Sequence, residues 1–321
     1  MKAIIQHEYG MPETLEFGDV ETPTVRDDEI LVAVRASSVN PLDWHTVTGA
    51  PYLVRIQAGW RRPKQAVAGS DMAGQVAAVG RAVTRFKAGD EVFGLCTGTF
   101  AEYVRIREAR AVPKPAGVTF EQAAAVPVAG LTALQGLRAG RIQAGQQVLI
   151  NGAAGGVGTF AVQLAKHWGA DVTAVCGTRN VEIVRSLGAD HVVDYTCEDY
   201  TNGETRYDLI LDMMGNHSLS ASRRVLAPRG TLVLISGPKT NRWFGPLGQL
   251  VRALVVSRFF SQRMVGILAR NNVDDLAFLV GLIADRSVTP AIGRTFPLRE
   301  VPDALGLLGA GHAQGKIVVT M

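Results

Sequence analysis

The sequence predicts an α/β protein of two domains, one β-barrel-like and one built around a doubly wound parallel sheet. Three observations support this prediction. Residues 148–158 pass from an apolar strand through a glycine-rich turn into a helix. Residues 1 to about 120 contain short β-rich runs separated by turn residues. The chain has 321 residues, 47% hydrophobic and 19% charged, which suits a globular protein with more than one core.

The first 120 residues are expected to form the barrel-like domain. Their strands are predicted at 30–34, 76–79, 91–95 and 100–104, and helical periodicity is mostly absent between them. Near Glu121 the spacing of apolar residues becomes helical, so we predict a domain boundary at 122/123.

The glycine-rich turn Asn151–Gly158 begins a βαβαβ unit. The predicted elements are a strand at 148–150, a helix at 159–168, a strand at 171–176, a helix at 180–187 and a strand at 191–194. Residues without side chains let a diphosphate approach the backbone, while the first N–H groups of the helix point at its charge. The turn therefore predicts a dinucleotide site, and the alternative is a turn without a ligand in a non-binding α/β domain.

The remaining elements extend the sheet and then return to the first domain. We predict strands at 208–213, 231–235 and 263–268, with a helix at 217–226. Helices at 274–283 and 301–308, a link at 290–298 and a strand at 316–319 are too short to form a domain of their own. The predicted domains are therefore 1–122 completed by 270–321, and 123–269.

The segment 243–260 is unusually apolar, with Leu247, Leu250 and Leu254 on one helical stripe. Three interpretations stay open for it. It is a surface helix packed on the core or on a partner subunit, a lid over an apolar substrate, or a helix on a membrane surface, for which its cationic face is thin.

Composition excludes several classes of function. The net charge of +4 comes from 33 basic and 29 acidic residues. The basic residues are scattered except for Arg61-Arg62-Pro63-Lys64 and the stretch Arg242 to Arg263, and nucleic-acid binding needs a denser basic stripe than this. Three distant cysteines argue against a disulfide framework and for a reducing compartment. The N-terminus lacks the apolar core of a signal peptide, and no run reaches membrane-spanning length, so we expect a cytoplasmic protein.

The residues after the second strand of the βαβαβ unit predict NADPH over NADH. NAD-specific sites place a carboxylate there to bind the ribose 2′-OH, but this chain has Gly177-Thr178-Arg179-Asn180. Arg179 can form a charge-assisted fork to a 2′-phosphate, and Thr178 can donate a hydroxyl. Alternatively, Thr178 and Asn180 only cap the next helix and Arg179 is solvated.

Several motifs together resemble the medium-chain dehydrogenase/reductase superfamily, in particular its zinc-free quinone oxidoreductase (zeta-crystallin-like) branch. The resemblance implies a GroES-like β-barrel domain, a Rossmann domain, NAD(P)-dependent reduction and a possible homodimer formed through the sixth strand. The motifs that carry it are Asn40-Pro41-Leu42-Asp43, Gly69 to Gly74, Gly89 to Val92, Gly130 to Leu134, Ala153 to Gly158, Gly188-Ala189-Asp190 and Gly315 to Val318.

The resemblance and the strand ends together predict the residues that contact the cofactor. Ligands bind at the carboxyl ends of strands in open α/β sheets, and the resemblance implies that Tyr195 flanks the adenine. The predicted cofactor-binding residues are Thr132, Gly155, Gly156, Val157, Gly158, Thr178, Arg179, Tyr195, Met214, Ser236, Gly237 and Lys316.

The resemblance also implies that no zinc is bound. Asn40 stands where a zinc enzyme has its first cysteine, Ser70-Asp71 where it has His-Glu, and Val128 near its second cysteine, while Leu42 replaces the relay hydroxyl. We therefore predict metal-free, direct hydride transfer from NADPH in the interdomain cleft, to a small apolar enone, quinone or other carbonyl substrate.

Asn40 and Tyr52 are the predicted hydrogen-bond donors to the substrate. The alternative for Asn40 is an amide that only fixes its own loop. A purely structural role is an equally open alternative for Tyr52. Two other functions also remain. One is an enoyl-thioester reductase, in which Arg61, Arg62 and Lys64 meet a phosphorylated carrier, and the other is a non-catalytic NADPH-binding protein.

Overall fold

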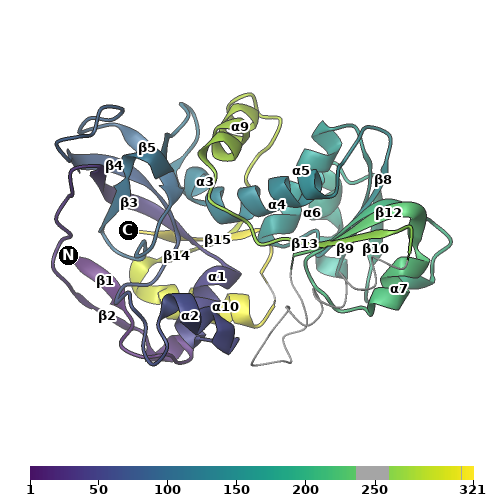
Figure 1. Ribbon diagram of the computed structural model, residues 1–321, viewed down its shortest axis with the longest axis horizontal. Helices are drawn as coiled ribbons and strands as arrows, with labels where there is room; N and C mark the ends of the chain where they lie inside the picture. Colours follow the sequence, from purple (N-terminus) through teal and green to yellow (C-terminus); the bar gives the residue numbers. More distant parts are fainter. Residues whose placement is uncertain (236–259, 312) are drawn as a thin grey trace. The chain divides into compact units, whose positions relative to one another are not determined.

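The computed structural model describes residues 1–235, 260–311 and 313–321, and the chain forms two compact units (Figure 1). Unit 1 is Met1–Leu131 with Asn271–Met321, and unit 2 is Thr132–Arg270. The first boundary therefore lies inside helix α4 (Pro127–Ala139) rather than at the predicted 122/123. The start of α4 stays with unit 1 because the Val128 N–H donates to Asp71 of that unit.

Unit 1 is organised by a sheet of order β14-β15-β3-β4-β5-β7, with β6 also paired to β3. Neighbouring strands are antiparallel except β14 and β15, and β1 pairs with β2 in a separate ribbon. Two buried apolar clusters fill the unit, centred on residues such as Phe100 and Met72. The strands are β1 (Lys2–Ile5), β2 (Glu16–Asp19), β3 (Glu29–Val39), β4 (Asp71–Val79), β5 (Glu91–Leu95), β6 (Tyr103–Arg107), β7 (Ala111–Pro113), β14 (Ile292–Pro297) and β15 (Lys316–Thr320).

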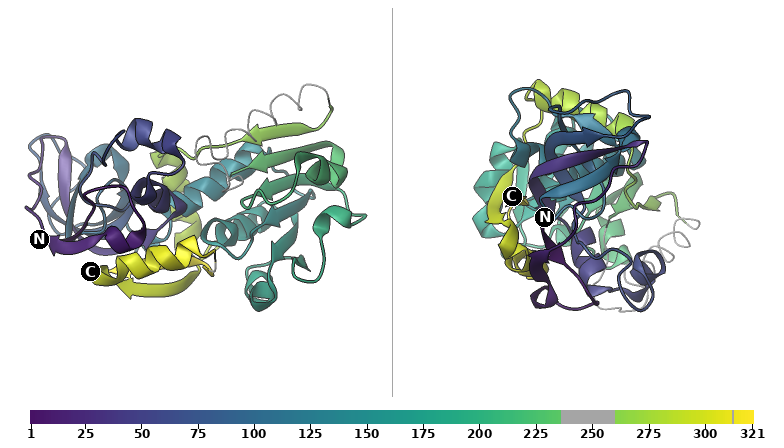
Figure 2. Two further views of the ribbon diagram at one scale, coloured as in Figure 1. Left: turned by 90° about the horizontal axis from the view of Figure 1, so that it is seen from below. Right: turned by 90° about the vertical axis from the view of Figure 1, so that its left-hand side faces the viewer.

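Helices of unit 1 differ most from the prediction. Two short helices, α1 (Pro41–Thr48) and α2 (Arg55–Ala58), lie where helical periodicity was weak. The predicted link at 290–298 is the strand β14, which extends the sheet beside β15. The other helices are α3 (Phe120–Ala124), α9 (Val273–Ala284) and α10 (Val301–Gly309), and α10 lies against β14 and β15 (Figure 2).

Unit 2 contains a parallel sheet of order β10-β9-β8-β11-β12-β13. In order along the chain this is 3-2-1-4-5-6, the arrangement of the Rossmann fold, so the predicted fold class is confirmed. Helices α5 (Gly156–His167), α6 (Val181–Ser186) and α7 (Leu219–Arg224) pack against it (Figure 1). The strands are β8 (Gln147–Asn151), β9 (Asp171–Cys176), β10 (His191–Asp194), β11 (Tyr207–Asp212), β12 (Leu226–Leu234) and β13 (Arg263–Gly266).

Short 3₁₀ turns connect these elements at η1 (Pro12–Thr14), η2 (Tyr52–Val54), η3 (Glu108–Arg110), η4 (Thr178–Asn180), η5 (Tyr200–Asn202) and η6 (Leu298–Glu300). Of the helices that the structure describes, none has both the length and the apolar character needed to cross a membrane.

Candidate nucleotide site and buried polar network

The turn after β8 in unit 2 has the geometry of a nucleotide-binding loop. Gly152 has a φ of +90°, which favours glycine, and Gly155 is the N-cap residue of α5 without a side-chain cap. Because Gly155 has no side chain, it cannot accept a hydrogen bond from the first N–H groups of α5. An anion bound there receives N–H groups and the positive end of the helix dipole.

Gly158 lets this turn close. A Cβ added at Gly158 lies 2.2 Å from the Gly152 carbonyl oxygen, a separation that no side chain tolerates. A Cβ at Gly155 lies 3.5 Å from the same oxygen, which is ordinary contact. Gly158 thus has a structural reason to be glycine, whereas Gly155 leaves space on the outside of the loop. Gly156 and Val157 lie in the first turn of α5, which begins three residues before the predicted helix start at Thr159.

Two buried polar residues, Asn151 and Asp212, lie where the strand order of unit 2 reverses, between β8 and β11. Asn151 Nδ2 donates to Asp212 Oδ1 at 2.9 Å, and the same oxygen accepts the N–H groups of Met214 and Gly215 at 3.0 and 2.9 Å. This carboxylate therefore fixes the turn after β11. Sequence reasoning missed both residues, although each is a polar residue that ends a buried strand at the switch point.

The turn Gly177–Asn180 exposes Thr178 and Arg179, as a phosphate-binding role requires. The Thr178 hydroxyl, however, lies 2.9 Å from the Thr196 hydroxyl, which donates to Asp194 Oδ1 at 2.7 Å. Asp194 is the last residue of the neighbouring strand β10. The sequence analysis did not predict that a carboxylate would lie beside this turn. Hydrogen bonds, first that from Thr178, hold the pKa of Asp194 below its usual value. Arg179 is thus the exposed cation of a turn that also has an acid nearby.

The other predicted cofactor residues are placed as follows. Tyr195 is 64% exposed and covers Gly177, since a Cβ there would lie 3.0 Å from its hydroxyl oxygen. Met214 is 53% exposed and its side chain lies over Gly152, whereas Thr132 is buried in α4. Ser236 and Gly237, together with the apolar segment 243–259, lie outside the described residues.

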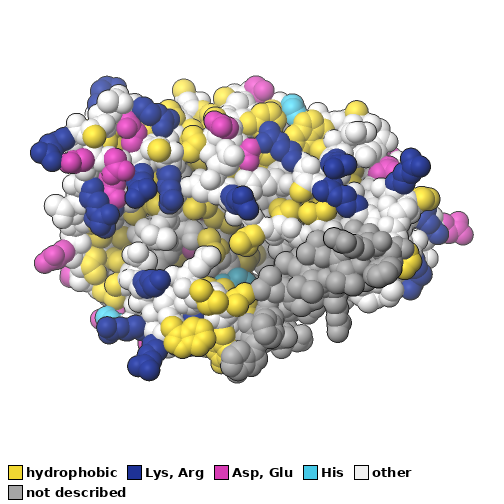
Figure 3. All heavy atoms as spheres, in the orientation of Figure 1, with side chains coloured by type: hydrophobic (Ala, Val, Ile, Leu, Met, Phe, Trp, Pro, Cys, Tyr) yellow, Lys and Arg dark blue, Asp and Glu magenta, His cyan; other side chains and the backbone are white. Residues whose placement is uncertain are grey.

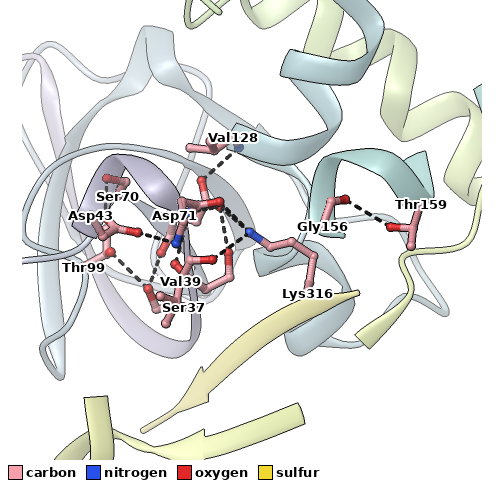
Figure 4. Close-up of polar contacts among 12 residues, drawn as sticks. Ser37, Val39, Asp43, Ser70, Asp71, Thr99, Val128, Gly156, Thr159 and Lys316 are labelled. Carbon is pink, nitrogen blue, oxygen red and sulfur yellow. Dashed lines mark hydrogen bonds and ion pairs between the residues drawn. The ribbon is translucent and has the colours of Figure 1, made fainter. Parts of the chain in front are cut away.

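Unit 1 contains a buried polar network centred on Asp71 of β4 (Figure 4). Asp71 Oδ2 accepts the Ser38 hydroxyl at 2.7 Å and Asn40 Nδ2 at 2.9 Å, and Oδ1 accepts the Val128 N–H at 3.0 Å. Lys316 Nζ lies 3.7 Å from Oδ2 as an ion pair. Three other stretches of the chain, at residues 38–40, 128 and 316, therefore meet at the Asp71 carboxylate.

A second carboxylate, Asp43 of α1, extends this network. Asp43 accepts the Asn40 N–H at 2.8 Å and the Ser70 hydroxyl at 2.6 Å. Lys316, on β15, donates to Asn40 Oδ1 at 2.5 Å and to the Val39 carbonyl at 3.3 Å. The ammonium is thus held by one amide oxygen, one carbonyl and the charge of Asp71.

Burial sets the charges of this network. It raises the pKa of Asp43 to about 7, with a further increase from Asp71 and opposing effects of the Ser70 hydroxyl and Lys316. Burial likewise raises the pKa of Asp71 and lowers that of Lys316, while each of these two charges favours ionisation of the other. All three groups are at most 2% exposed. The network therefore contains one ion pair and a second carboxyl that titrates near neutral pH.

The structure engages both atoms of the Asn40 side chain within the network. Nδ2 donates to Asp71 and to the Ser38 carbonyl, Oδ1 accepts Lys316, and the residue is 2% exposed. The alternative that the amide fixes its own surroundings matches this geometry, and its role as a donor to substrate stays a prediction. Tyr52 is half-buried in η2, with its ring centre 4.8 Å from the Arg55 guanidinium. Lys316, predicted to bind cofactor, has its ammonium inside unit 1.

The side chains at the positions named for zinc do not fit a zinc ion. The Asn40 amide is fully bonded, the Ser70 hydroxyl donates to Asp43, and Val128 contributes only its N–H to the network. Lys316 already places a positive charge beside Asn40 and Asp71. Within the part of the chain that the structure describes, no three His, Cys, Asp or Glu side chains are grouped as metal ligands.

Comparisons with known proteins cover the whole chain. Residues 26–116 match the alcohol dehydrogenase GroES-like domain, and residues 187–319 match the family described as zinc-binding dehydrogenase. The chain is 33% identical, over 99% of its length and 98% of the relative's, to a chloroplast envelope quinone oxidoreductase homolog of Arabidopsis thaliana. It is also 33% identical, over 99% of its length and 79% of the relative's, to an NADPH-dependent alkenal/one oxidoreductase of the same plant. The structure of a quinone oxidoreductase from Coxiella burnetii has a TM-score of 0.88 and 31% identity, and covers 100% of this chain and 99% of its own.

Proposed function

Because the chain belongs to the quinone oxidoreductase branch of the medium-chain dehydrogenase/reductase superfamily, we propose that it reduces enones or quinones with NADPH and without a metal. That it is an oxidoreductase follows from this membership. The choice of cofactor, the class of substrate and the absence of metal are the proposal. The observation that carries it is the turn Gly152–Gly158, whose glycines leave the start of α5 accessible to a diphosphate.

Residues of unit 2 would hold the cofactor. The backbone N–H groups of Gly156 and Val157 would receive the diphosphate at the start of α5. Arg179, exposed on η4, would bind the 2′-phosphate, and Tyr195 would flank the adenine. Bound NADPH supplies a hydride and no proton. Asp194 and Thr178 are hydrogen-bonded through Thr196, so Arg179 is the main determinant of phosphate preference in this proposal.

The substrate requires a hydride acceptor that needs no Lewis acid. In an enone the hydride adds to the β-carbon, the conjugated oxygen takes the negative charge, and a proton from solvent completes the reduction. Since the Asn40 amide is engaged by Asp71 and Lys316, we propose Tyr52 as the hydrogen-bond donor to the substrate oxygen and Asn40 as a positioning residue. The location of the substrate stays a prediction from the resemblance.

The test is turnover of a panel of quinones, alkenals and enoyl thioesters with NADPH and NADH, beside fluorescence titration of both cofactors. A charge-assisted hydrogen bond contributes about 1.5–3 kcal/mol, so Arg179→Ala should weaken NADPH on the order of tenfold to a hundredfold and leave NADH nearly unchanged. Arg206→Ala is the matched control, because Arg206 is an exposed arginine of the same unit that only bonds its own loop.

Three results would contradict parts of the proposal. Equal losses for both cofactors, or a wild type that prefers NADH, would remove the role of Arg179. Binding of NADPH without turnover of any substrate would favour the non-catalytic alternative. Turnover of enoyl thioesters alone would favour the enoyl-thioester reductase.

A further inference from the structure

In the segment 52–60 of unit 1, the arginine is half-buried while three large apolar side chains are exposed. Arg55, in α2, lies between two aromatic rings, with its guanidinium 4.4 Å from the ring centre of Tyr9 and 4.8 Å from that of Tyr52. Its Nε donates to the Gly49 carbonyl at 2.9 Å, and the Tyr9 hydroxyl donates to the Gly59 carbonyl at 2.5 Å. These contacts fix which side of the segment faces the unit.

The outer side of the same segment consists of large apolar side chains. Leu53, Ile56 and Trp60 are 37%, 63% and 66% exposed. Leu53 lies in η2, Ile56 lies in α2, and Trp60 follows directly after Gly59, the residue that ends α2. Soluble proteins usually turn large apolar side chains inward. Most of the surface of Ile56 and Trp60 faces solvent instead, and Leu53 adds a smaller exposed area beside them.

Three cations follow these apolar residues directly. Arg61, Arg62 and Lys64 are exposed, and they form no ion pair with any described residue. The Lys64 N–H donates to the Ala58 carbonyl at 2.7 Å, which folds residues 59–64 back onto the end of α2. Figure 3 shows apolar side chains over α2, with Lys and Arg side chains beside them. We call Leu53, Ile56, Trp60, Arg61, Arg62 and Lys64 the apolar–basic surface.

The size and charge of this surface favour a lipid bilayer over a protein partner. Three apolar side chains cannot supply the roughly 800 Å² per partner that a stable protein interface buries. A bilayer needs only shallow insertion of a few apolar residues, with cations level with the headgroups. Tryptophan is suited to that boundary, because its ring is apolar and its N–H is polar. Free Lys and Arg side chains beside the apolar residues complement anionic headgroups.

We propose that the apolar–basic surface docks this protein onto membranes that contain anionic lipid. Ile56 and Trp60 insert at the level of the headgroups, and Arg61, Arg62 and Lys64 pair with lipid phosphates and carboxylates. The attachment is peripheral and reversible. It does not rest on the proposed function, although apolar quinones and enones dissolve in such membranes.

The test is flotation of the full chain with vesicles of phosphatidylcholine alone and with vesicles that also contain phosphatidylserine. We expect binding to the anionic vesicles, weakened by salt. Each basic residue near the bilayer strengthens binding on the order of fivefold. Replacing Arg61, Arg62 and Lys64 together by Ala should therefore weaken binding on the order of a hundredfold. Ile56→Ser with Trp60→Ser should also weaken it, while Trp60→Phe should largely retain it.

Leu268→Ser is the matched control, because Leu268 is 88% exposed but lies in unit 2. It should bind vesicles as the wild type does, and circular dichroism should show that every variant is folded. The proposal is overturned if the wild type does not bind anionic vesicles, if it binds neutral vesicles equally well, or if the control loses as much binding as the surface variants. Self-association that the Ile56 and Trp60 changes abolish, without vesicle binding, would assign the surface to a second copy of the chain.

Discussion

Replacing Asp43 by Asn should remove a loss in the free energy of unfolding of unit 1 that occurs in the wild type as the pH rises towards 7. Asp43 is fully buried and accepts two hydrogen bonds, from the Asn40 N–H and the Ser70 hydroxyl. An amide can keep both contacts, because its oxygen can accept the Asn40 N–H and its NH₂ group can donate to the Ser70 oxygen. The substitution therefore removes the titrating group while it preserves shape and hydrogen bonding.

The sign and size of the effect follow from the pKa of Asp43. Burial raises it to about 7 in the folded protein, against roughly 3.9 in an unfolded chain. Between these values the folded state binds more protons, so the contribution of Asp43 is complete below about pH 4 and is lost as the pH rises towards 7. The ceiling of this loss is about 4 kcal/mol, and relaxation around the buried charge lowers it to roughly 2–4 kcal/mol.

The assay is urea unfolding from pH 4.5 to 8.5, followed by the intrinsic fluorescence of the four tryptophans, one of which, Trp44, packs on the core of unit 1. The free energy of unfolding of Asp43→Asn minus that of the wild type should be small at the acid end. It should grow by roughly 2–4 kcal/mol towards pH 8. Parallel pH profiles for the two proteins would refute the reasoning, because Asp43 would then titrate alike in both states.

Three further outcomes are expected. Gly158→Ala should lower the free energy of unfolding by roughly 1–3 kcal/mol, because its Cβ meets the Gly152 oxygen, whereas Gly155→Ala should stay near the wild type; equal effects would contradict the account of the turn. Lys316→Met should cost about 3–5 kcal/mol, and Asp71→Asn in the same chain should recover part of this, so additive losses in urea unfolding would show that the two charges are not paired. Active protein should contain no stoichiometric zinc by elemental analysis and should keep its activity in a chelator, and activity lost with the metal would disprove metal independence.

The sheet of unit 2 could be predicted because its elements repeat one local pattern. Strands β9 and β10 begin and end where the sequence predicted, since each apolar run is bounded by glycine or polar turn residues. In unit 1 the same reasoning failed for β14, whose exposed residues Arg294 and Thr295 give no apolar run. β14 is a strand because β15 pairs with it, and that pairing is not visible in local sequence.

The nucleotide turn could likewise be predicted from local sequence, whereas the polar network could not. Gly152 to Gly158 are adjacent in the chain, so their spacing carries the signal. Asn40, Asp71 and Lys316 are far apart in sequence, and only the pairing of β3 with β4 and β15 brings them together. The resemblance drew attention to Asn40 and Asp71 as substituted metal positions. It gave no indication that Lys316 would pair with Asp71 and donate to Asn40.

The return of the chain to unit 1 has a consequence for how the protein is made. β15 is paired between β14 and β3, and it carries the lysine that neutralises Asp71. A ribosome releases these residues only after the whole of unit 2. Unit 1 must therefore wait with an unfilled position in its sheet and without the cation that pairs with Asp71, while unit 2, which is continuous in sequence, can fold first. Nascent chains that stall before β15 should therefore expose unit 1 to chaperones and proteases. For the same reason, a stop codon just before β15 should be as damaging to unit 1 as one in the middle of the barrel.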